Sequence, residues 1–221
     1  MELIILRVEG TEGFEQDYRK YVKYISEERT LRIERIRSEK QKIVSLLTEL
    51  LIRLNAMKTL GLKNDHITIR LGEHGKPCLE GKPHYHFSVS HAGSFIAFIS
   101  DFCPVGVDIE NSSRGNADIA KRFFTENEYK KIYCQSPAAY TFPEVWTRKE
   151  AYVKLVGTGL SHGLNTFDVT DNTEKCFFYT YAYDENYTVS VCTEREASCV
   201  KISELNEHML LEELKKRYDF F

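Results

Sequence analysis

A regular spacing of apolar residues between Ser38 and Gly61 predicts one long buried helix. The apolar residues recur every three or four positions, as a helix with one buried face requires. These positions are Ile43, Leu46, Leu47, Leu50, Leu51, Leu54 and Met57. Ser38 followed by Gln41 predicts a capping box at the start, and Gly61 is a typical helix-ending residue. A strongly basic helix is predicted just before it, over residues 26–37, with Ser26 as N-cap.

Alternating apolar and polar positions elsewhere predict short strands. The predicted strands cover residues 1–8, 66–71, 86–90, 95–100, 103–110, 177–185 and 187–194. The third and fourth of these form a hairpin around the turn HAG, and the last two form another. Ser90 and His91 therefore stand at the mouth of the first hairpin.

Further helices are predicted after Asn116, from the capping box Thr125-x-x-Glu128, around Trp146 and over residues 209–218. The order strand, helices, hairpin thus occurs twice, once to about residue 100 and again from about residue 103. This order predicts an α+β fold of two similar halves with pseudo-two-fold symmetry, each a small antiparallel sheet with packed helices. We place the N-terminal half at residues 1–102 and the C-terminal half at residues 103–221.

The composition is typical of an ordinary soluble globular protein. Charged residues make up 29% and apolar residues 42% of the chain, which excludes disordered and fibrous classes. The apolar run at residues 1–8 is too short for a signal peptide or a membrane span, so a cytoplasmic protein is expected. The six cysteines are scattered without a C-x-x-C pair, which indicates reduced thiols.

The net charge of −3 argues against a nucleic-acid partner, because such proteins usually show a basic balance. Any anion site must therefore be local. The basic side chains near the start of the long helix are candidates: Arg29, Arg32, Arg35, Arg37, Lys40 and Lys42. The alternative is a solvated polar face. Neither nucleic acid nor membrane is expected as a partner, and a monomer is expected.

The strand VGVDIE, residues 105–110, carries two acidic residues on one face. Its period of two places Gly106, Asp108 and Glu110 together and the apolar residues on the other side. Neighbouring carboxylates repel each other unless they are solvated, protonated or bridged by a cation. A solvated strand end is the alternative reading. If Glu150 packs over this strand, three oxygen donors converge, which suits Mg²⁺.

The stretch WTRKEAYVK, residues 146–154, sets Trp146, Glu150 and Lys154 four residues apart on one helix face. Glu150 with Lys154 is also the favoured arrangement for a weak surface ion pair, so the stretch alone does not decide between the two readings. Trp146 is interpreted as a packing residue that orients the helix.

Three histidines, His84, His86 and His91, raise a zinc alternative. An H-x-H pair on a strand points two imidazoles to one side, but nearby Cys78 adds only one further ligand. Magnesium is therefore favoured over zinc. His91, at the hairpin mouth, is the better functional candidate.

Five motifs, in this order along the chain, resemble those of one family. They are GKP (75–77), FSVSHAG (87–93), VGVDIE (105–110), RFFTENEY (122–129) and WTRKEAYVKLVGTGL (146–160). Together they resemble the Sfp-type 4′-phosphopantetheinyl transferases. The resemblance runs from about Ser26 to Cys192, most of the chain. No single motif is specific, but five in order are strong evidence.

The resemblance implies two similar halves with coenzyme A bound between them and Mg²⁺ on its pyrophosphate, Mn²⁺ being an alternative cation. The implied reaction moves 4′-phosphopantetheine to a serine hydroxyl of an apo acyl or peptidyl carrier protein and releases 3′,5′-ADP. Carriers of fatty-acid, polyketide, peptide and siderophore assembly are all compatible with these residues.

The resemblance also implies residue roles. Asp108, Glu110 and Glu150 would hold the metal, and Glu150 would also be the base for the serine. Lys154 would meet the phosphate chain, which makes Asp108, Glu150 and Lys154 the catalytic set. The implied coenzyme A contacts besides Lys154 are Lys76, Pro77, Ser90, His91, Arg29 and Arg32. Many members carry an arginine where this chain reads KIVSLL, and Lys40 or Lys42 is the alternative here.

Two other functions stay open. A non-catalytic carrier-binding protein of this fold would be expected to lack Asp108, Glu150 or Lys154, and all three are present. Another Mg²⁺-dependent phosphate-transfer enzyme would be expected to carry the loop GxxxxGK[ST], which the chain lacks.

Overall fold

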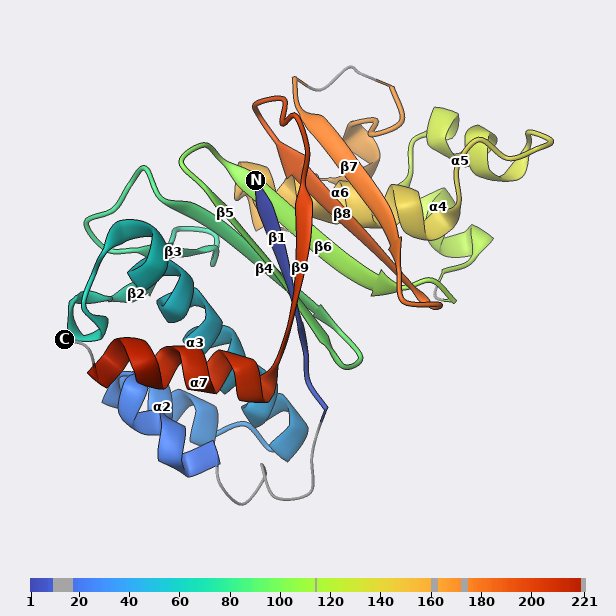
Figure 1. Ribbon diagram of the computed structural model, residues 1–221. Coiled ribbons are helices and arrows are strands. Elements are labelled where there is room, and N and C mark those ends of the chain that lie inside the picture. The colour runs from blue at the N-terminus through green and yellow to red at the C-terminus, as the bar shows by residue number, and fades with distance from the viewer. Residues whose placement is uncertain (10–17, 114, 160–162, 172–174, 220–221) are drawn as a thin grey trace.

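The computed structural model describes residues 1–9, 18–113, 115–159, 163–171 and 175–219. In chain order the elements are β1 (Glu2–Arg7), the 3-10 helix η1 (Tyr18–Tyr24), α2 (Glu27–Glu34), α3 (Glu39–Leu60), η2 (Asn64–His66), β2 (Ile69–Leu71), β3 (Pro77–Leu79), β4 (His86–Ala92), β5 (Phe95–Asp101), β6 (Val105–Asn111), α4 (Ala117–Phe123), α5 (Glu126–Tyr133), α6 (Phe142–Val156), η4 (Leu164–Thr166), β7 (Phe177–Tyr183), β8 (Tyr187–Thr193), β9 (Lys201–Asn206) and α7 (Glu207–Asp219). Small sheets with helices packed on them make an α+β fold, as predicted (Figure 1). Within the described part of the chain, no helix has the length and apolarity that crossing a bilayer requires.

The first sheet has the strand order β4-β5-β1-β9. β4 and β5 form the predicted antiparallel hairpin, and β1 pairs antiparallel with β5. The apolar stripe of α3 packs into one core with this sheet, where Leu46, Leu50 and Phe98 are completely buried. α2 and α7 lie beside α3 (Figure 1).

The sequence did not predict β9. This strand pairs in parallel with β1, with Leu3 opposite Ile202, and α7 then contributes Leu210 and Leu214 to the core around α3. β9 reads KISELN and lies at a sheet edge, so its apolar pattern is too weak to announce a strand. The chain therefore returns to the first sheet after completing the second one. The division at residues 102 and 103 stays a prediction.

The second sheet is antiparallel, with the strand order β6-β8-β7. α6 packs directly across β6, and the contact is so close that a Cβ on Gly106 would stand 1.9 Å from the carbonyl oxygen of Ala151. Glycine at this position is what allows the helix to approach the strand. The side chains on α6 are thereby set against the polar face of β6.

The predicted division of β6 into two faces is confirmed. Val105, Val107 and Ile109 are buried in a core that β6 shares with residues of the first sheet, among them Leu3 and Ile99. Gly106 and Asp108 face α6 instead. The two sheets thus bury their apolar faces against each other, and the polar face of β6 is left for α6.

The predicted helix N-caps and the predicted end of α3 are confirmed, whereas α2 ends at Glu34, before the predicted end at residue 37. The Ser26 hydroxyl accepts a hydrogen bond from the backbone N–H of Arg29, and Ser38 caps α3 through Gln41. Gly61 ends α3 with φ of 64°, in the left-handed region that favours glycine. The capping box at the start of α5 is present in both directions.

Candidate active site

Asp108 on β6 is the centre of the polar contacts between β6 and α6. The residue is only 4% exposed. Its Oδ1 atom accepts hydrogen bonds from Lys154 Nζ on α6 at 2.7 Å and from Ser90 Oγ on β4 at 2.7 Å. Its Oδ2 atom is buried and accepts no hydrogen bond from any described residue. One oxygen of this carboxylate is therefore doubly satisfied, and the other is available to a ligand.

Glu150 on α6 lies close to Asp108 and Glu110 on β6, as a site shared by these three carboxylates requires. Its side chain is partly buried, and burial is the largest effect that raises its pKa, followed by repulsion from Asp108. Glu110 raises the pKa further, and the Lys154 ammonium opposes the shift. Asp108 and Glu110 are therefore close enough to Glu150 to influence its protonation.

The fit of these residues to a divalent cation can be judged from their chemistry. Among the described residues, no three His, Cys, Asp or Glu side chains stand together as a ready-made metal cluster. Asp108 nevertheless presents a buried acceptor oxygen without a donor, and Glu110 and Glu150 add only oxygen atoms nearby. Oxygen ligands without sulfur or imidazole suit Mg²⁺ or Mn²⁺, so the residues present fit such an ion.

Trp146 packs among aromatic rings, as interpreted from the sequence. Its ring is stacked on Phe142 at a centroid distance of 5.8 Å and meets Phe123 edge-on at 5.8 Å. Trp146, Phe142 and Ile119 also line a small cavity of about 170 Å³ that reaches Glu110 at the end of β6. Trp146 thus contributes to how α6 is seated rather than to the polar contacts around Asp108.

A completely buried ion pair next to Glu150 was missed in the sequence. Lys149 and Glu128 are both 0% exposed, with Nζ and Oε2 2.8 Å apart. The same ammonium donates to the carbonyl oxygens of Leu164 at 2.6 Å and Phe167 at 2.7 Å. The pair joins α6 to α5 and to the segment after α6. In the sequence, Glu128 was assigned to the capping box of α5, and this assignment gave no reason to expect a contact with Lys149.

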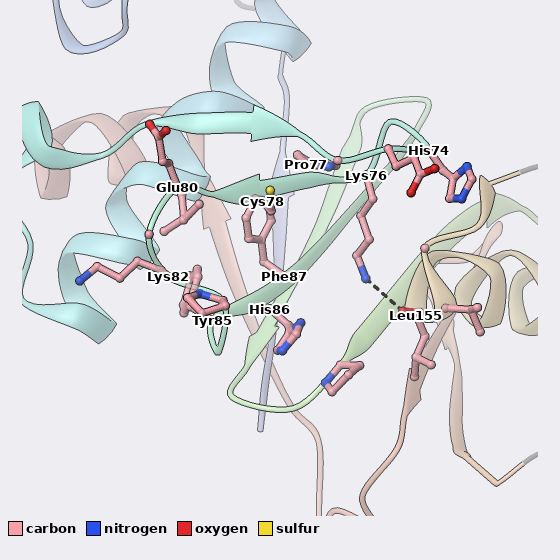
Figure 2. Close-up of a pocket in the computed structure, with 18 residues that line it drawn as sticks. His74, Lys76, Pro77, Cys78, Glu80, Lys82, Tyr85, His86, Phe87 and Leu155 are labelled. Carbon is pink, nitrogen blue, oxygen red and sulfur yellow. Dashed lines mark hydrogen bonds between the residues drawn. The ribbon is translucent and has the colours of Figure 1, made fainter.

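A cavity of about 620 Å³ lies between the β2–β3 hairpin and the carboxyl end of α6 (Figure 2). Lys76 and Pro77 line it, together with Leu155 from α6. The Lys76 ammonium points to α6 and donates to the carbonyl oxygens of Leu155 and Val105, each at 3.2 Å. Burial lowers the pKa of Lys76 to about 8. Lys76 therefore connects the first half of the chain to both β6 and α6.

The structure distributes the other expected coenzyme A contacts over several places. Ser90 contacts Asp108, whereas His91, the next residue on β4, is exposed. Arg29 bridges α2 and α3 through Glu49 at 3.3 Å and through the Ser45 hydroxyl at 2.9 Å. Arg32 is exposed. None of these residues lines the cavity of Figure 2, so Lys76 and Pro77 stand apart from the rest of the set.

Comparisons with known proteins match this chain to one family. A family model described as 4′-phosphopantetheinyl transferase superfamily matches residues 104–208, and one described as 4′-phosphopantetheinyl transferase, N-terminal, matches residues 12–103. A 4′-phosphopantetheinyl transferase of Bacillus subtilis is 37% identical over 70% of this chain and 75% of its own length.

Two further relatives cover more of the chain. The 4′-phosphopantetheinyl transferase psf-1 of Bacillus pumilus is 33% identical over 85% of this chain and 87% of its own. The 4′-phosphopantetheinyl transferase Sfp of Bacillus subtilis strain 168 is 29% identical over 80% and 86%. The family models and these relatives identify the class of the protein: it is a group-transferring enzyme with an α+β fold. The chain belongs to the Sfp-type 4′-phosphopantetheinyl transferase family.

Proposed function

We propose that this enzyme transfers 4′-phosphopantetheine from coenzyme A to a serine hydroxyl of an apo acyl or peptidyl carrier protein. The reaction depends on Mg²⁺ and releases 3′,5′-ADP. The observation that supports this proposal most is the carboxylate of Asp108, which is held by Lys154 and Ser90 on one oxygen and is buried without a donor on the other. A cation that binds there would lie between two α+β halves, beside a lysine that can contact phosphate.

The proposed chemistry assigns a task to each residue around Asp108. The serine oxygen forms a bond to the phosphorus that carries pantetheine, and the bond from this phosphorus to the bridging pyrophosphate oxygen breaks. The electron pair of the broken bond leaves with 3′,5′-ADP. Glu150 accepts the serine proton, directly or through a water molecule. Lys154 lies one helical turn after Glu150, where its ammonium can contact the phosphate oxygens.

The metal would be held by Asp108, Glu110 and Glu150. When bound, Mg²⁺ supplies charge neutralisation on the pyrophosphate, which is the main requirement of phosphoryl transfer. Without a cation, three carboxylates would repel an anionic substrate.

We also propose that the cavity of Figure 2, with Lys76 and Pro77, receives the nucleotide end of coenzyme A. Its volume of about 620 Å³ is within the usual range for small-molecule sites. Ser90, His91, Arg29 and Arg32 remain the other proposed contacts. Exchanging both Lys76 and His91 for alanine should weaken binding of coenzyme A more than binding of dephospho-coenzyme A, because charge-assisted contacts to the 3′-phosphate are lost. Calorimetry with both ligands measures the difference, and equal losses would refute the assignment.

The proposal is tested by incubating the protein with coenzyme A, Mg²⁺ and a panel of apo carrier proteins, with intact mass as the readout. We expect one carrier to gain one phosphopantetheine group in the presence of Mg²⁺ and none in EDTA. The Asp108→Ala variant should transfer no group, although its circular dichroism spectrum should match that of the parent and so show that it is folded. Full activity in EDTA would overturn the metal assignment. A chain that binds carriers but modifies none of them would instead be a non-catalytic carrier-binding protein.

A further inference from the structure

β4 and β6 are the outer strands of two different sheets, and they face each other at the junction of the two halves. Serine side chains join them across this junction. The Ser88 hydroxyl accepts a hydrogen bond from the backbone N–H of Val107 at 3.0 Å, and the Ser90 hydroxyl donates to Asp108 Oδ1 at 2.7 Å. Ser88 and Ser90 are two residues apart on β4, so their side chains leave the strand on the same side.

This serine pair determines how Asp108 is presented. Ser88 ties the backbone of β6 just before Asp108, and Ser90 binds the carboxylate itself. Lys154 binds the same Oδ1 atom, so both fixed donors lie on one side of the carboxylate. A carboxylate that is held in this way directs its second oxygen, the buried Oδ2, in one direction.

We propose that Ser90 is a positioning residue for the metal site: it holds Asp108 through Oδ1 so that Oδ2 faces the cation. This inference rests on the proposed function, and it gives Ser90 a task in addition to the proposed contact with coenzyme A. The side chain that orients a ligand of the second half thus comes from the first half.

Ser90 suits this task better than Lys154. Its hydroxyl stands one bond beyond Cβ on a paired strand, so little conformational entropy is lost when it is held in place. The Lys154 side chain is long and 28% exposed, and its ammonium has a second proposed partner in the phosphates. When Lys154 turns to phosphate, Ser90 remains as the donor that fixes Asp108.

The test measures the affinity for Mn²⁺ rather than catalysis. Free Mn²⁺ is followed by electron paramagnetic resonance during titration of the full chain, with saturating coenzyme A and without carrier protein. Loss of a side chain that orients a metal ligand typically weakens metal binding by about 10- to 100-fold, and we expect Ser90→Ala to fall in this range. Ser90→Thr keeps the hydroxyl, so its affinity for Mn²⁺ should stay within about threefold of the parent value. This change is well below the effect that loss of an orienting side chain produces.

Ser203→Ala is the matched control. Ser203 lies on β9 at the opposite edge of the same sheet, and its hydroxyl also donates to a carboxylate, that of Glu2. This variant should bind Mn²⁺ with the parent affinity. If Ser90→Ala does not fold, Ser90→Cys, which keeps the size of the side chain but donates only weakly, takes its place with the same expected direction.

Three outcomes would overturn the inference. If Ser90→Ala binds Mn²⁺ as tightly as the parent, Ser90 does not orient Asp108. If the same variant keeps its Mn²⁺ affinity but loses affinity for coenzyme A far more than for dephospho-coenzyme A, Ser90 is a phosphate contact. A parent protein that binds no Mn²⁺ would overturn the metal assignment of the proposed function and this inference with it. The first two outcomes overturn the inference alone, so the two failures can be told apart.

Discussion

Glu150 shows how the local environment can prepare a single side chain for two tasks. Burial and the neighbouring Asp108 both raise the pKa of Glu150, so its charged form is disfavoured. A carboxyl group in that condition gains from a bound cation, which would stabilise its charged form and lower its pKa again. Lys154 moderates the repulsion from the opposite direction.

Glu150→Gln separates these tasks. It keeps the shape and one oxygen ligand but removes the basic site, so coenzyme A binding should stay near the parent value by calorimetry. Transfer should slow by about 100-fold or more, the usual effect of losing a general base. Single-turnover mass spectrometry measures the transfer. A variant that transfers at the parent rate would show that Glu150 is only the ion-pair neighbour of Lys154.

At the scale of elements, buried contacts hold α6 in position at both ends of its active face. The Lys149–Glu128 pair fixes the helix to α5, and Lys76 fixes its carboxyl end to the β2–β3 hairpin. Neither contact involves the carboxylates of Asp108, Glu110 or Glu150 directly. Both determine where Glu150 and Lys154 lie relative to β6.

Lys149→Met should destabilise the fold by about 3–5 kcal/mol, because it leaves the carboxylate of Glu128 buried without its counter-charge. Urea unfolding measures the loss. The double variant with Glu128→Gln should recover part of it, since no buried charge remains. Lys130→Met is the matched control: its partner Glu126 is on the same α5 helix but fully exposed, and no measurable change is expected. Equal losses for both single variants would contradict the role of burial.

Lys76 predicts a pH dependence of stability. Its pKa falls from 10.5 in the unfolded chain to about 8 in the fold, chiefly through burial. Between these values the unfolded state binds more protons, so the contribution of Lys76 to stability rises as pH increases from about 8 to 10.5. The difference in free energy of unfolding between parent and Lys76→Met should therefore shift in favour of the parent across this range. Thermal unfolding at several pH values measures it, and a constant difference would contradict the prediction.

At the scale of the whole molecule, the two halves are not independent in the chain. The last described strand and helix, β9 and α7, complete the first sheet and its core after the second sheet has been formed. A core is also shared between the two sheets. Stability of the first half should therefore depend on residues far beyond residue 102.

Leu214→Ala tests this dependence. Leu214 on α7 is 0% exposed in the core around α3, and such substitutions cost about 2–5 kcal/mol. Met209→Ala, on the same helix but 46% exposed, should change the free energy of unfolding by less than about 0.5 kcal/mol. Denaturant unfolding compares the two. Similar small effects for both variants would mean that α7 adds little to the first half.

The sequence determined the features that depend on neighbouring residues. Helix caps at Ser26, Ser38 and Thr125 follow from side chains that bond to backbone groups three residues away. The placement of Asp108 with Gly106 on one face of β6 follows from the strand period, and that of Glu150 and Lys154 from the helix period. These local rules hold whatever the rest of the chain does.

Only the tertiary structure decided which of these faces meet. The contact of Ser90 with Asp108 joins strands of different sheets, and the Lys149–Glu128 pair joins two helices. β9 gained its partner from residues almost two hundred positions earlier in the chain. Such contacts depend on how the sheets and helices pack in three dimensions, and a hydroxyl or an ammonium in the sequence carries no sign of which distant oxygen it will reach.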